Sequence, residues 1–150
     1  MTDQNAFRIV SPVSAADFED YYDLRWRMLR APWQQPPGSE KDDREAESTH
    51  LMAIDSNRRV LGVGRLHLNS PTEAQVRFMA VEESAQGRGL GGALLQELET
   101  RARKAGAKRI VLNAREGGAQ AFYARNGYVV TGPAPTMFSV VKHVRMTKEL

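Results

Sequence analysis

A glycine-rich loop between an apolar strand and an amphipathic helix constrains this chain more than any other stretch. Four of the six residues from Gly87 to Gly92 are glycine. Glycine lacks a Cβ atom and adopts positive φ angles readily, so this backbone can approach a ligand closely. The helix that follows presents unpaired N–H groups and the positive end of its dipole, which together favour an anion. The loop therefore predicts a cradle for a diphosphate.

The alternative is a loop in which glycine serves only to turn the chain. A glycine-rich loop without a flanking strand and helix is weak evidence for phosphate binding. Here both flanks are present, because residues 73–81 predict a strand that enters the loop and residues 90–105 predict a helix that leaves it. This context favours the cradle.

The composition is typical of a globular protein, and we predict a single domain over residues 1–150. Hydrophobic residues make up 41% of the chain and charged residues 26%, and 150 residues suffice to bury a core without disulfides. The absence of cysteine excludes thiolate nucleophiles and cysteine-ligated metals, and is typical of the cytoplasm. Neither residues 1–5 nor any later stretch carries the apolar run of a signal or membrane segment. We therefore expect a cytoplasmic protein with no membrane partner.

The net charge of +3 is a mild bias that suits an anionic ligand. A nucleic-acid-associated protein is a separate possibility, because the sequence pI is about 9.4 and cations gather at residues 101–109. Cations at the C-terminal end of a helix explain that cluster adequately, since the helix dipole favours them there. We therefore expect no nucleic-acid partner.

The first predicted helix begins at a capping box, with Ser14 as the N-cap and Asp17 three residues later. One helical face then carries a hydrophobic stripe made of Phe18, Tyr22, Trp26 and Leu29. Such a stripe usually packs in a core, and the alternative is that Trp26 or Tyr22 lines a substrate pocket.

A proline-rich loop ends this helix at residues 32–38, and a charged segment, predicted as a short surface helix, follows at residues 39–48. Loops of this kind often carry specificity. Arg25, Arg30 and Trp33 are therefore candidates for a second-substrate pocket, with a solvated connection as the alternative.

Alternating patterns and apolar runs predict the remaining strands and helices. The strands are residues 6–10, 49–55, 59–68, 73–81, 109–114, 128–131 and 137–147, with a short helix at residues 118–126. Residues 56–58 are expected to form a hairpin turn, and Gly62 and Gly64 indicate either a close approach to the third strand or a bend in it. This order predicts an α/β fold of the mixed α+β kind, with a central mixed sheet of about seven strands and helices on both faces.

Two motifs resemble those of the GNAT superfamily of CoA-dependent N-acyltransferases. Residues 86–91, Gln-Gly-Arg-Gly-Leu-Gly, are similar to its Q/R-x-x-G-x-G/A motif. Residues 119–128, Ala-Gln-Ala-Phe-Tyr-Ala-Arg-Asn-Gly-Tyr, resemble its A-x-x-F/L-Y-x-x-x-G-F/Y motif. Both lie at the family's spacing. One position departs from the pattern, because Glu116 stands where many relatives have asparagine; Asn113 is the candidate to replace it.

The resemblance implies that the chain binds acetyl-CoA as a co-substrate. The backbone of Met79, Ala80 and Val81 would pair with the pantetheine amides as an added strand would. The backbone of the glycine loop would hold the diphosphate. The cofactor-binding residues implied beyond that strand are Gln86, Gly87, Arg88, Gly89, Leu90, Gly91, Gly92, Asn113, Ala119 and Phe122.

The resemblance also implies an acyl transfer in which Tyr123 protonates the departing thiolate and a backbone N–H near Met79 or Val81 stabilises the oxyanion. The alternative for Tyr123 is a packing role. The base that deprotonates the amine is left open between Glu73, His67, His143 and water. His143 is the preferred histidine, with a structural role as its alternative.

Candidate residues for the acyl acceptor, a small-molecule or protein amine, are Arg77, Glu73, Trp26 and Arg30. Arg77 is expected to share a strand face with Met79 and Val81. The three histidines show no ligand spacing, so no metal site is expected. A homodimer formed through the last strand, at Phe138 and Val140, is possible. A non-catalytic acyl-CoA-binding or regulatory module of the same fold is the alternative to an enzyme.

Overall fold

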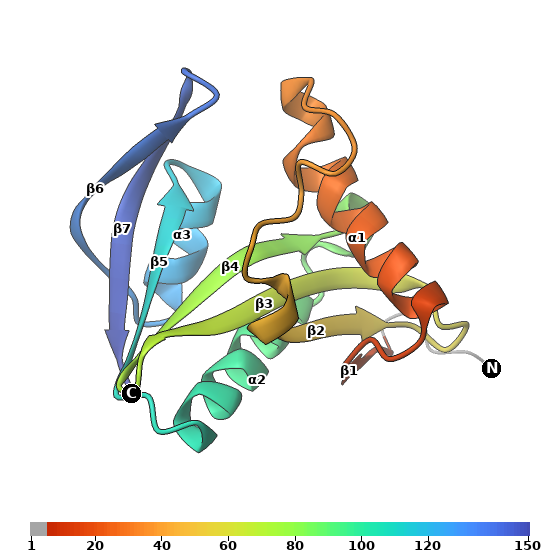
Figure 1. Ribbon diagram of the computed structural model, residues 1–150, viewed down its shortest axis with the longest axis horizontal. Coiled ribbons are helices and arrows are strands. Elements are labelled where there is room, and N and C mark those ends of the chain that lie inside the picture. The colour runs from red at the N-terminus through yellow and green to blue at the C-terminus, as the bar shows by residue number, and fades with distance from the viewer. Residues whose placement is uncertain (1–5) are drawn as a thin grey trace.

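The computed structural model describes residues 6–150, so the expectations that concern residues 1–5 lie outside it. One mixed sheet runs through the molecule with the strand order β1-β2-β3-β4-β5-β7-β6 (Figure 1). Its strands are β1 (Arg8–Val10), β2 (Thr49–Ile54), β3 (Val60–Ser70), β4 (Glu73–Val81), β5 (Arg109–Arg115), β6 (Val129–Met137) and β7 (Val141–Glu149). The predicted mixed seven-stranded fold is confirmed.

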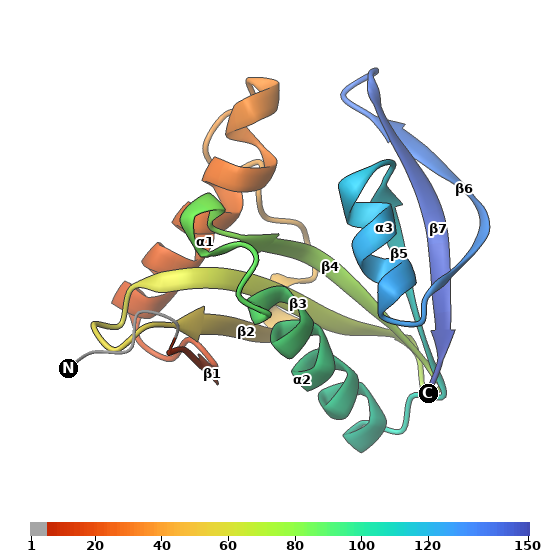
Figure 2. The same cartoon turned by 180° about the vertical axis from the view of Figure 1, so that it is seen from behind.

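Helices cover both faces of this sheet. Helix α1 (Ala15–Leu29) lies on one face, and α2 (Leu90–Lys104) and α3 (Gly118–Arg125) lie on the other (Figures 1 and 2). The capping box of α1 forms as predicted, since the N of Asp17 donates to Ser14 Oγ at 3.0 Å and Ser14 N donates to Asp17 Oδ2 at 3.3 Å. Three short 3₁₀ turns complete the structure at Ala31–Trp33, Glu45–Glu47 and Glu83–Ala85.

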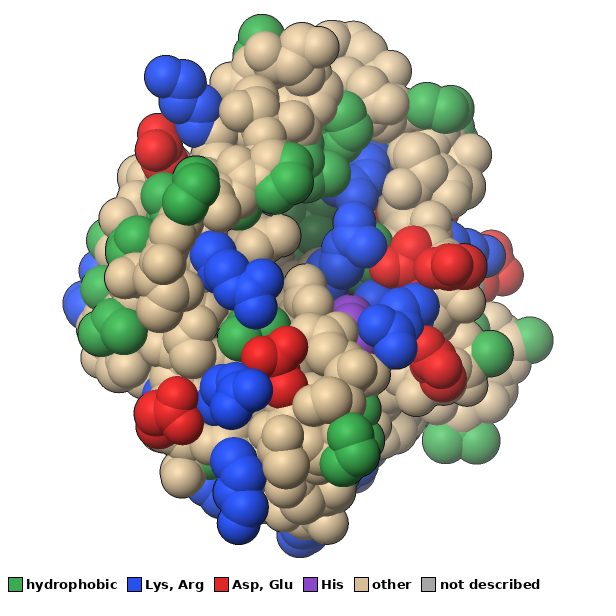
Figure 3. Space-filling model, turned by 60° about the vertical axis from the view of Figure 1, so that its left-hand side comes forward, with side chains coloured by type: hydrophobic (Ala, Val, Ile, Leu, Met, Phe, Trp, Pro, Cys, Tyr) green, Lys and Arg blue, Asp and Glu red, His purple; other side chains and the backbone are tan. Residues whose placement is uncertain are grey.

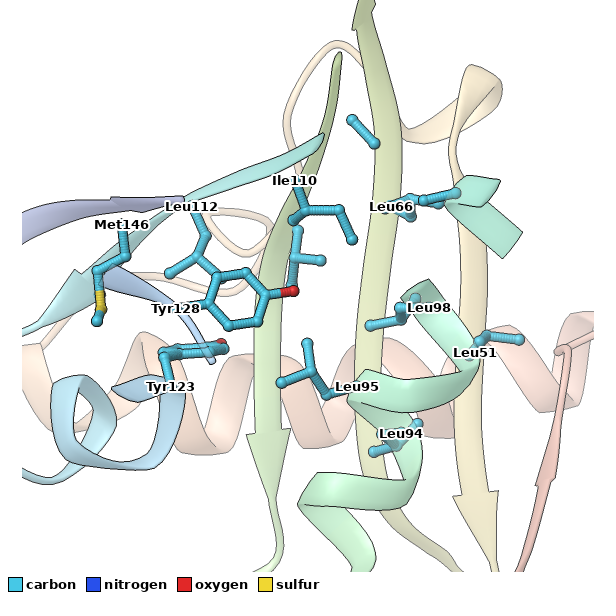
Figure 4. Close-up of a cluster of buried hydrophobic side chains, with 14 of the residues drawn as sticks. Leu51, Leu66, Leu94, Leu95, Leu98, Ile110, Leu112, Tyr123, Tyr128 and Met146 are labelled. Carbon is cyan, nitrogen blue, oxygen red and sulfur yellow. The ribbon is translucent and has the colours of Figure 1, made fainter. Parts of the chain in front are cut away.

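The buried side chains form two clusters, one on each face of the sheet. The larger lies between the sheet and the helices α2 and α3, and it contains Leu94, Leu98, Ile110, Tyr123 and Tyr128 (Figure 4). The smaller packs α1 against β2, β3 and β4. A side chain can therefore be assigned to a face of the sheet by the cluster it joins.

The predicted apolar stripe of α1 is only partly right. Phe18, Tyr22, Trp26 and Leu29 are all half-buried, whereas the fully buried side chains of the helix are those of Tyr21, Leu24 and Arg25. The most buried face is therefore rotated from the predicted one, because a buried arginine occupies a core position and conceals the periodicity.

Two glycines allow α2 to pack closely on β3. A Cβ atom on Gly62 would lie 2.6 Å from Leu90 Cδ2, and one on Gly64 would lie 2.9 Å from Leu98 Cδ1. The close approach predicted for these positions is confirmed. It fixes the start of α2, and with it the glycine loop, against the sheet.

Strands β4 and β5 pair only at their beginnings. Their parallel ladder joins Glu73, Ala74 and Gln75 to Arg109, Ile110 and Val111 and then stops. Beyond Gln75 the two strands diverge, and the sheet opens into a V (Figures 1 and 2). Within the described residues, the edge of β4 that faces β5 therefore has no strand partner from Val76 onward.

A bulge in β4 corrects the prediction that Arg77, Met79 and Val81 share a face. The β3–β4 register shifts between Val63 and Arg65, and Phe78 has a φ of 57°. Before the bulge Val76 packs with α2, and after it Met79 and Val81 do so. Arg77 and Phe78 are thus both turned to the α1 face, because the extra residue reverses the alternation.

The C-terminal hairpin differs from its prediction. The chain forms β6 straight through Pro133 and Pro135, and it turns at Phe138 and Ser139, which have φ angles of 52° and 64°. The sheet accepts these prolines because β6 is its edge strand. Strand β7 lies between β5 and β6, so the dimer contact predicted through this last strand would have to use β6 instead.

Candidate active site

The open end of the V is the candidate site, and the glycine loop forms its floor on the α2 side. Gly87 and Gly89 have φ angles of 81° and 76°, and a Cβ atom on either would meet no atom within 4 Å. The glycines are therefore required by backbone conformation, and the space beside them is open.

The start of α2 supplies hydrogen-bond donors to this space. The first hydrogen bond of the helix runs from Ala93 N to Gly89 O at 3.1 Å, and Gly89 is an N-cap without a side-chain oxygen. The N–H groups of Leu90, Gly91 and Gly92 precede that bond, so the helix itself does not satisfy them. They point their partial positive charge toward the loop.

Side chains of the loop brace its own backbone. Gln86 Nε2 donates to Val81 O at 3.1 Å, and Arg88 Nη2 donates to Ser84 O at 3.1 Å. Both residues were predicted as cofactor ligands. In this structure their side chains hold the loop in shape, which leaves the backbone as its ligand-facing part.

Helix α3 packs against the start of α2 through Phe122. A Cβ atom on Gly91 would lie 3.4 Å from the Phe122 ring and 3.6 Å from Val81 Cγ2. Ala119, one turn earlier, packs on the same core. These packing contacts join α2, α3 and β4 and fix the start of α2 beside the end of β4.

Tyr123, on α3, is buried in a largely apolar environment. Its side chain belongs to the core behind the sheet, and its ring makes edge contacts with Phe122 and Tyr128 at centroid distances of 5.1 and 5.7 Å. In Figure 4 it extends from α3 toward α2. Burial raises the pKa of its hydroxyl well above the ordinary value, so the phenol is protonated at neutral pH.

Polar side chains of β5 and β7 line one wall of the V. Asn113 pairs across the strands with Arg145, and Arg115 with His143. Their neighbours on either side, Leu112, Ala114, Val144 and Met146, pack in the core behind the sheet, so this set projects from the opposite face. The predicted residues Asn113 and His143 are therefore brought together on one wall.

His143 differs from the other two histidines in its hydrogen bonding. Its Nδ1 lies 3.0 Å from Val141 O, and because a carbonyl can only accept, Nδ1 carries the proton and Nε2 is left basic. The Nδ1 of His67 accepts from Arg65 at 3.0 Å, and the Nδ1 of His50 is bonded to Tyr21 Oη at 2.9 Å. Only His143 combines a cleft position with a basic nitrogen outside such a bond in residues 6–150.

The opposite wall is built on Arg77 and Phe78, at the bulge of β4. Arg77 Nη1 donates to Asp42 Oδ2 at 2.7 Å, and its side chain is 40% exposed. The ring of Phe78 is buried beneath it. Arg30, from the end of α1, reaches the same ring, so two of the predicted acceptor residues meet here.

A buried ion network behind this wall is absent from the sequence predictions. Arg25 and Arg65 are fully buried, and both pair with Glu45, at 2.9 and 2.6 Å. Arg65 also pairs with Asp42. Residues 39–48 were predicted as a short surface helix; they form a 3₁₀ turn at Glu45–Glu47, and they carry the carboxylates that neutralise these arginines. The sequence signal that could have indicated this ion network is the group of acidic residues that follows the helix containing Arg25.

Glu73 and Trp26 lie away from this wall. Glu73 accepts from Asn69 Nδ2 and Arg109 Nε, both at 3.0 Å, at the closed end of the V. The Asn69 hydrogen bond is the main cause of its lowered pKa. Trp26 Nε1 donates to Gln35 O at 3.0 Å, and its ring lines a separate hollow of about 600 Å³ with Phe18. The structure does not gather these two predicted residues with Arg77.

The surface of the molecule is hollowed on the face that looks into the V. Figure 3 shows a depression with hydrophobic side chains at its base and rim and with Lys or Arg side chains along one side. Among the described residues there is no group of three or more His, Asp or Glu side chains that could hold a metal ion. None of the described helices is long and apolar enough to cross a membrane.

Several solved structures share this architecture. Ard1 from Thermoplasma volcanium is 23% identical, with a TM-score of 0.83 over 97% of this chain and 98% of that one. A GNAT family acetyltransferase from Elizabethkingia anophelis, with acetyl-CoA bound, is 17% identical, with a TM-score of 0.76 over 99% and 100%. An aminoglycoside 6′-N-acetyltransferase complexed with coenzyme A is 16% identical, with a TM-score of 0.78 over 96% of each chain.

These likenesses show that the fold is shared with solved acetyltransferases, one holding acetyl-CoA and one holding coenzyme A. The model of the acetyltransferase (GNAT) family matches residues 18–128, which span the first helix, the V and the glycine loop. The chain belongs to the GNAT family of acetyltransferases.

Proposed function

We propose that this protein transfers an acetyl group from acetyl-CoA to a primary amine by direct attack. The observation that carries the proposal is the divergence of β4 from β5 after Gln75, with the glycine loop at the same end of β4. A ligand with amides at one end and a diphosphate at the other requires an unpaired strand edge for the amides and an anion-binding loop next to it for the diphosphate.

In this proposal, acetyl-CoA supplies an activated thioester, and the protein holds it largely through backbone groups. Met79, Ala80 and Val81 offer their free edge to the pantetheine amides, and residues 87–92 offer N–H groups to the diphosphate. Asn113 lies on the opposite wall, at a position to contact the same ligand from β5.

The chemistry needs three things from the chain. The amine nitrogen first bonds to the thioester carbonyl carbon, which opens the C=O double bond and places negative charge on oxygen. The C=O bond then re-forms as the C–S bond breaks, and the charge passes to sulfur. A backbone N–H of β4 near Met79 or Val81 stabilises the charge on oxygen, since a fixed dipole needs no reorganisation. Tyr123 gives its proton to the sulfur.

Burial of Tyr123 is compatible with this role. A phenol in apolar surroundings is a weaker acid than in water, but the same surroundings raise the pKa of a thiol that departs beside it. The two pKa values move in the same direction, so proton transfer between them stays close to balanced.

We assign the removal of the amine proton to His143, directly or through water. The basic Nε2 inferred from its hydrogen bond to Val141 O supports this role, as does its place on the cleft wall. Glu73 is a poorer base, because its lowered pKa and its ion pair with Arg109 stabilise the ionised carboxylate.

A non-catalytic acyl-CoA-binding module is the second candidate, and the burial of Tyr123 in the core favours it. Two measurements on the same preparation separate the candidates. Calorimetry should show acetyl-CoA binding, and released thiol should appear when a panel of primary amines is added. Binding without thiol release over a broad panel would establish the module, and absence of binding would overturn both candidates.

A further inference from the structure

Four arginines surround one buried aromatic ring on the α1 face of β4. The guanidinium carbons of Arg25, Arg77, Arg65 and Arg30 lie 4.3, 4.4, 5.0 and 5.3 Å from the centroid of Phe78. The ring is at the bulge where β4 leaves β5, so this cationic cluster adjoins the open end of the V.

Carboxylates neutralise three of these arginines. Glu45 pairs with Arg25 and Arg65, and Asp42 pairs with Arg65 and Arg77. Arg25 and Arg65 are fully buried, and their ion pairs hold residues 39–48 against the sheet. Arg25 and Arg65 therefore serve the stability of the fold and are not accessible to a substrate.

Arg30 is neutralised by no ion pair within residues 6–150. Its residue is 8% exposed, and its Nε and Nη1 donate only to main-chain carbonyls, those of Ser39 at 3.0 Å and Leu29 at 3.1 Å. Its Nη2 makes no hydrogen bond to a described residue. Burial, then the charges of Arg77 and Arg25, lower its pKa, and the negative charge of Glu40 opposes them only in part.

Arg30 also reaches the other side of the cleft. Its guanidinium carbon lies 5.3 Å from the centroid of Phe138, at the tip of the β6–β7 hairpin. Arg77 uses Nη1 for Asp42 and remains 40% exposed. The two guanidiniums therefore share the ring of Phe78 at the mouth of the V, with donors left over on that side.

From this arrangement we infer that the acyl acceptor is an amine that also carries a carboxylate, and that Arg30 and Arg77 bind that carboxylate. The inference rests on the proposed acetyl transfer and specifies its substrate class. A planar carboxylate accepts two hydrogen bonds from guanidinium groups and restores charge balance around Arg30. Arg77 and Met79 have side chains on opposite faces, but both belong to the unpaired part of β4, so an amine near the bound anion lies along the strand edge proposed as the acyl site.

The cluster also weighs against cationic acceptors. A polyamine or another multiply charged amine would bring more positive charge next to Arg30 and Arg77, and like charges in a partly buried site repel strongly. Specificity would thus come from repulsion of the wrong amine as well as from attraction of the right one.

The test compares matched acceptors and matched variants. We expect kcat/KM to be at least about tenfold higher for amino acids than for their primary amides, although the amides have more of the reactive free amine at neutral pH. Arg30→Gln and Arg77→Gln should each raise KM for the carboxylate acceptors about tenfold or more and leave KM for acetyl-CoA unchanged. Arg58→Gln, which alters an exposed arginine paired with Asp17, should change neither constant.

Preference for the amides or for a polyamine would overturn the inference and leave the acetyl transfer standing. So would equal losses for both acceptor types in the Arg30 and Arg77 variants.

A binding measurement keeps the inference testable if no amine is acetylated. Saturation-transfer NMR with the CoA complex should detect the N-acetyl derivatives of the same amino acids, and the signal should vanish in both variants. Binding without turnover would support the carboxylate site and reject the proposed function, whereas absence of binding would reject the site.

Discussion

Gln86 Nε2 donates a hydrogen bond to the carbonyl oxygen of Val81 at 3.1 Å. The bond joins the residue that begins the glycine-rich stretch to the last residue of β4. It therefore fixes the diphosphate cradle relative to the strand edge proposed to hold pantetheine. The side chain of Gln86, predicted as a cofactor-binding residue, thus also ties the loop to the strand.

Gln86→Ala should weaken acetyl-CoA binding about fivefold, since one hydrogen bond contributes about 1 kcal/mol. The effect should appear in KM for acetyl-CoA, with kcat nearly unchanged, because the reacting atoms keep their surroundings. Gln96→Ala, on the exposed side of α2, serves as the control and should match the parent. Parental binding by Gln86→Ala would show that the loop keeps its shape without this bond.

Gly89→Val should reduce acetyl-CoA binding by about 100-fold or more, since a β-branched residue resists a φ of 76° and its side chain would enter the phosphate space. Calorimetry on the folded variant measures the loss. Gly106→Val imposes similar strain, at a φ of 92°, beyond the far end of α2. That control should lose stability and keep its affinity. If the two variants bind equally well, the cradle is misplaced.

Tyr123→Phe should lower kcat about 100-fold with little change in acetyl-CoA affinity, as expected for loss of a general acid. The parental rate should rise with pH as the amine loses its proton. Because burial raises the pKa of the Tyr123 hydroxyl, the phenol stays protonated at pH 10. The rate should therefore show no decline at any pH up to 10. A decline with a midpoint below pH 10 that disappears in the Phe variant would contradict this.

Tyr128→Phe is the matched control for that variant. Tyr128 Oη donates to the buried Glu99 at 2.9 Å, behind the cleft. This substitution should reduce stability by about 1 kcal/mol, since Glu99 retains Lys148 as a partner, and leave kcat per folded molecule unchanged. Equal kcat losses in both variants would indicate that Tyr123 serves packing alone.

Asp42→Asn should lower the free energy of unfolding by about 3 kcal/mol at pH 7, because it leaves the buried Arg65 with one carboxylate. Burial acts to raise the pKa of Asp42, but the Arg65 hydrogen bond and neighbouring cations outweigh it and hold the pKa well below its usual range. Such a group stabilises the fold above its unfolded pKa of about 3.9 and loses that contribution below it.

The difference between parent and Asp42→Asn should therefore shrink as the pH falls below about 4, measured by urea denaturation over a pH series. Asp43→Asn, at the exposed neighbouring residue, provides the control and should be nearly neutral. A difference that stayed constant down to pH 2 would show that the carboxylate charge is not what stabilises the segment.

Local patterns were sufficient for the elements that build the cradle. Helix α2 begins at Leu90 and ends before Gly106 as predicted, because capping, periodicity and glycine content are all properties of adjacent residues. The close packing at Gly62 and Gly64 could be predicted for the same reason, because two residues without side chains lie on one face of a single strand.

The acceptor wall could not be predicted this way, because it depends on partners that are distant in sequence. Arg25 meets Glu45 and Arg77 meets Asp42 across 20 and 35 residues, and no local signal pairs them. The bulge at Phe78 reverses the side-chain alternation of β4 without any glycine or proline to mark it, so Arg77 was wrongly grouped with Met79 and Val81, which lie on the opposite face.

Phe78 keeps a left-handed backbone conformation that costs a non-glycine residue about 1–2 kcal/mol. A chain under selection for stability alone would straighten β4 and extend its ladder with β5, and the resulting sheet would have no opening. The bulge thus lowers the stability of the sheet and keeps the opening between β4 and β5. Stabilising substitutions in this protein should be sought far from that strand, because the mutations that most improve the sheet are those most prone to seal it.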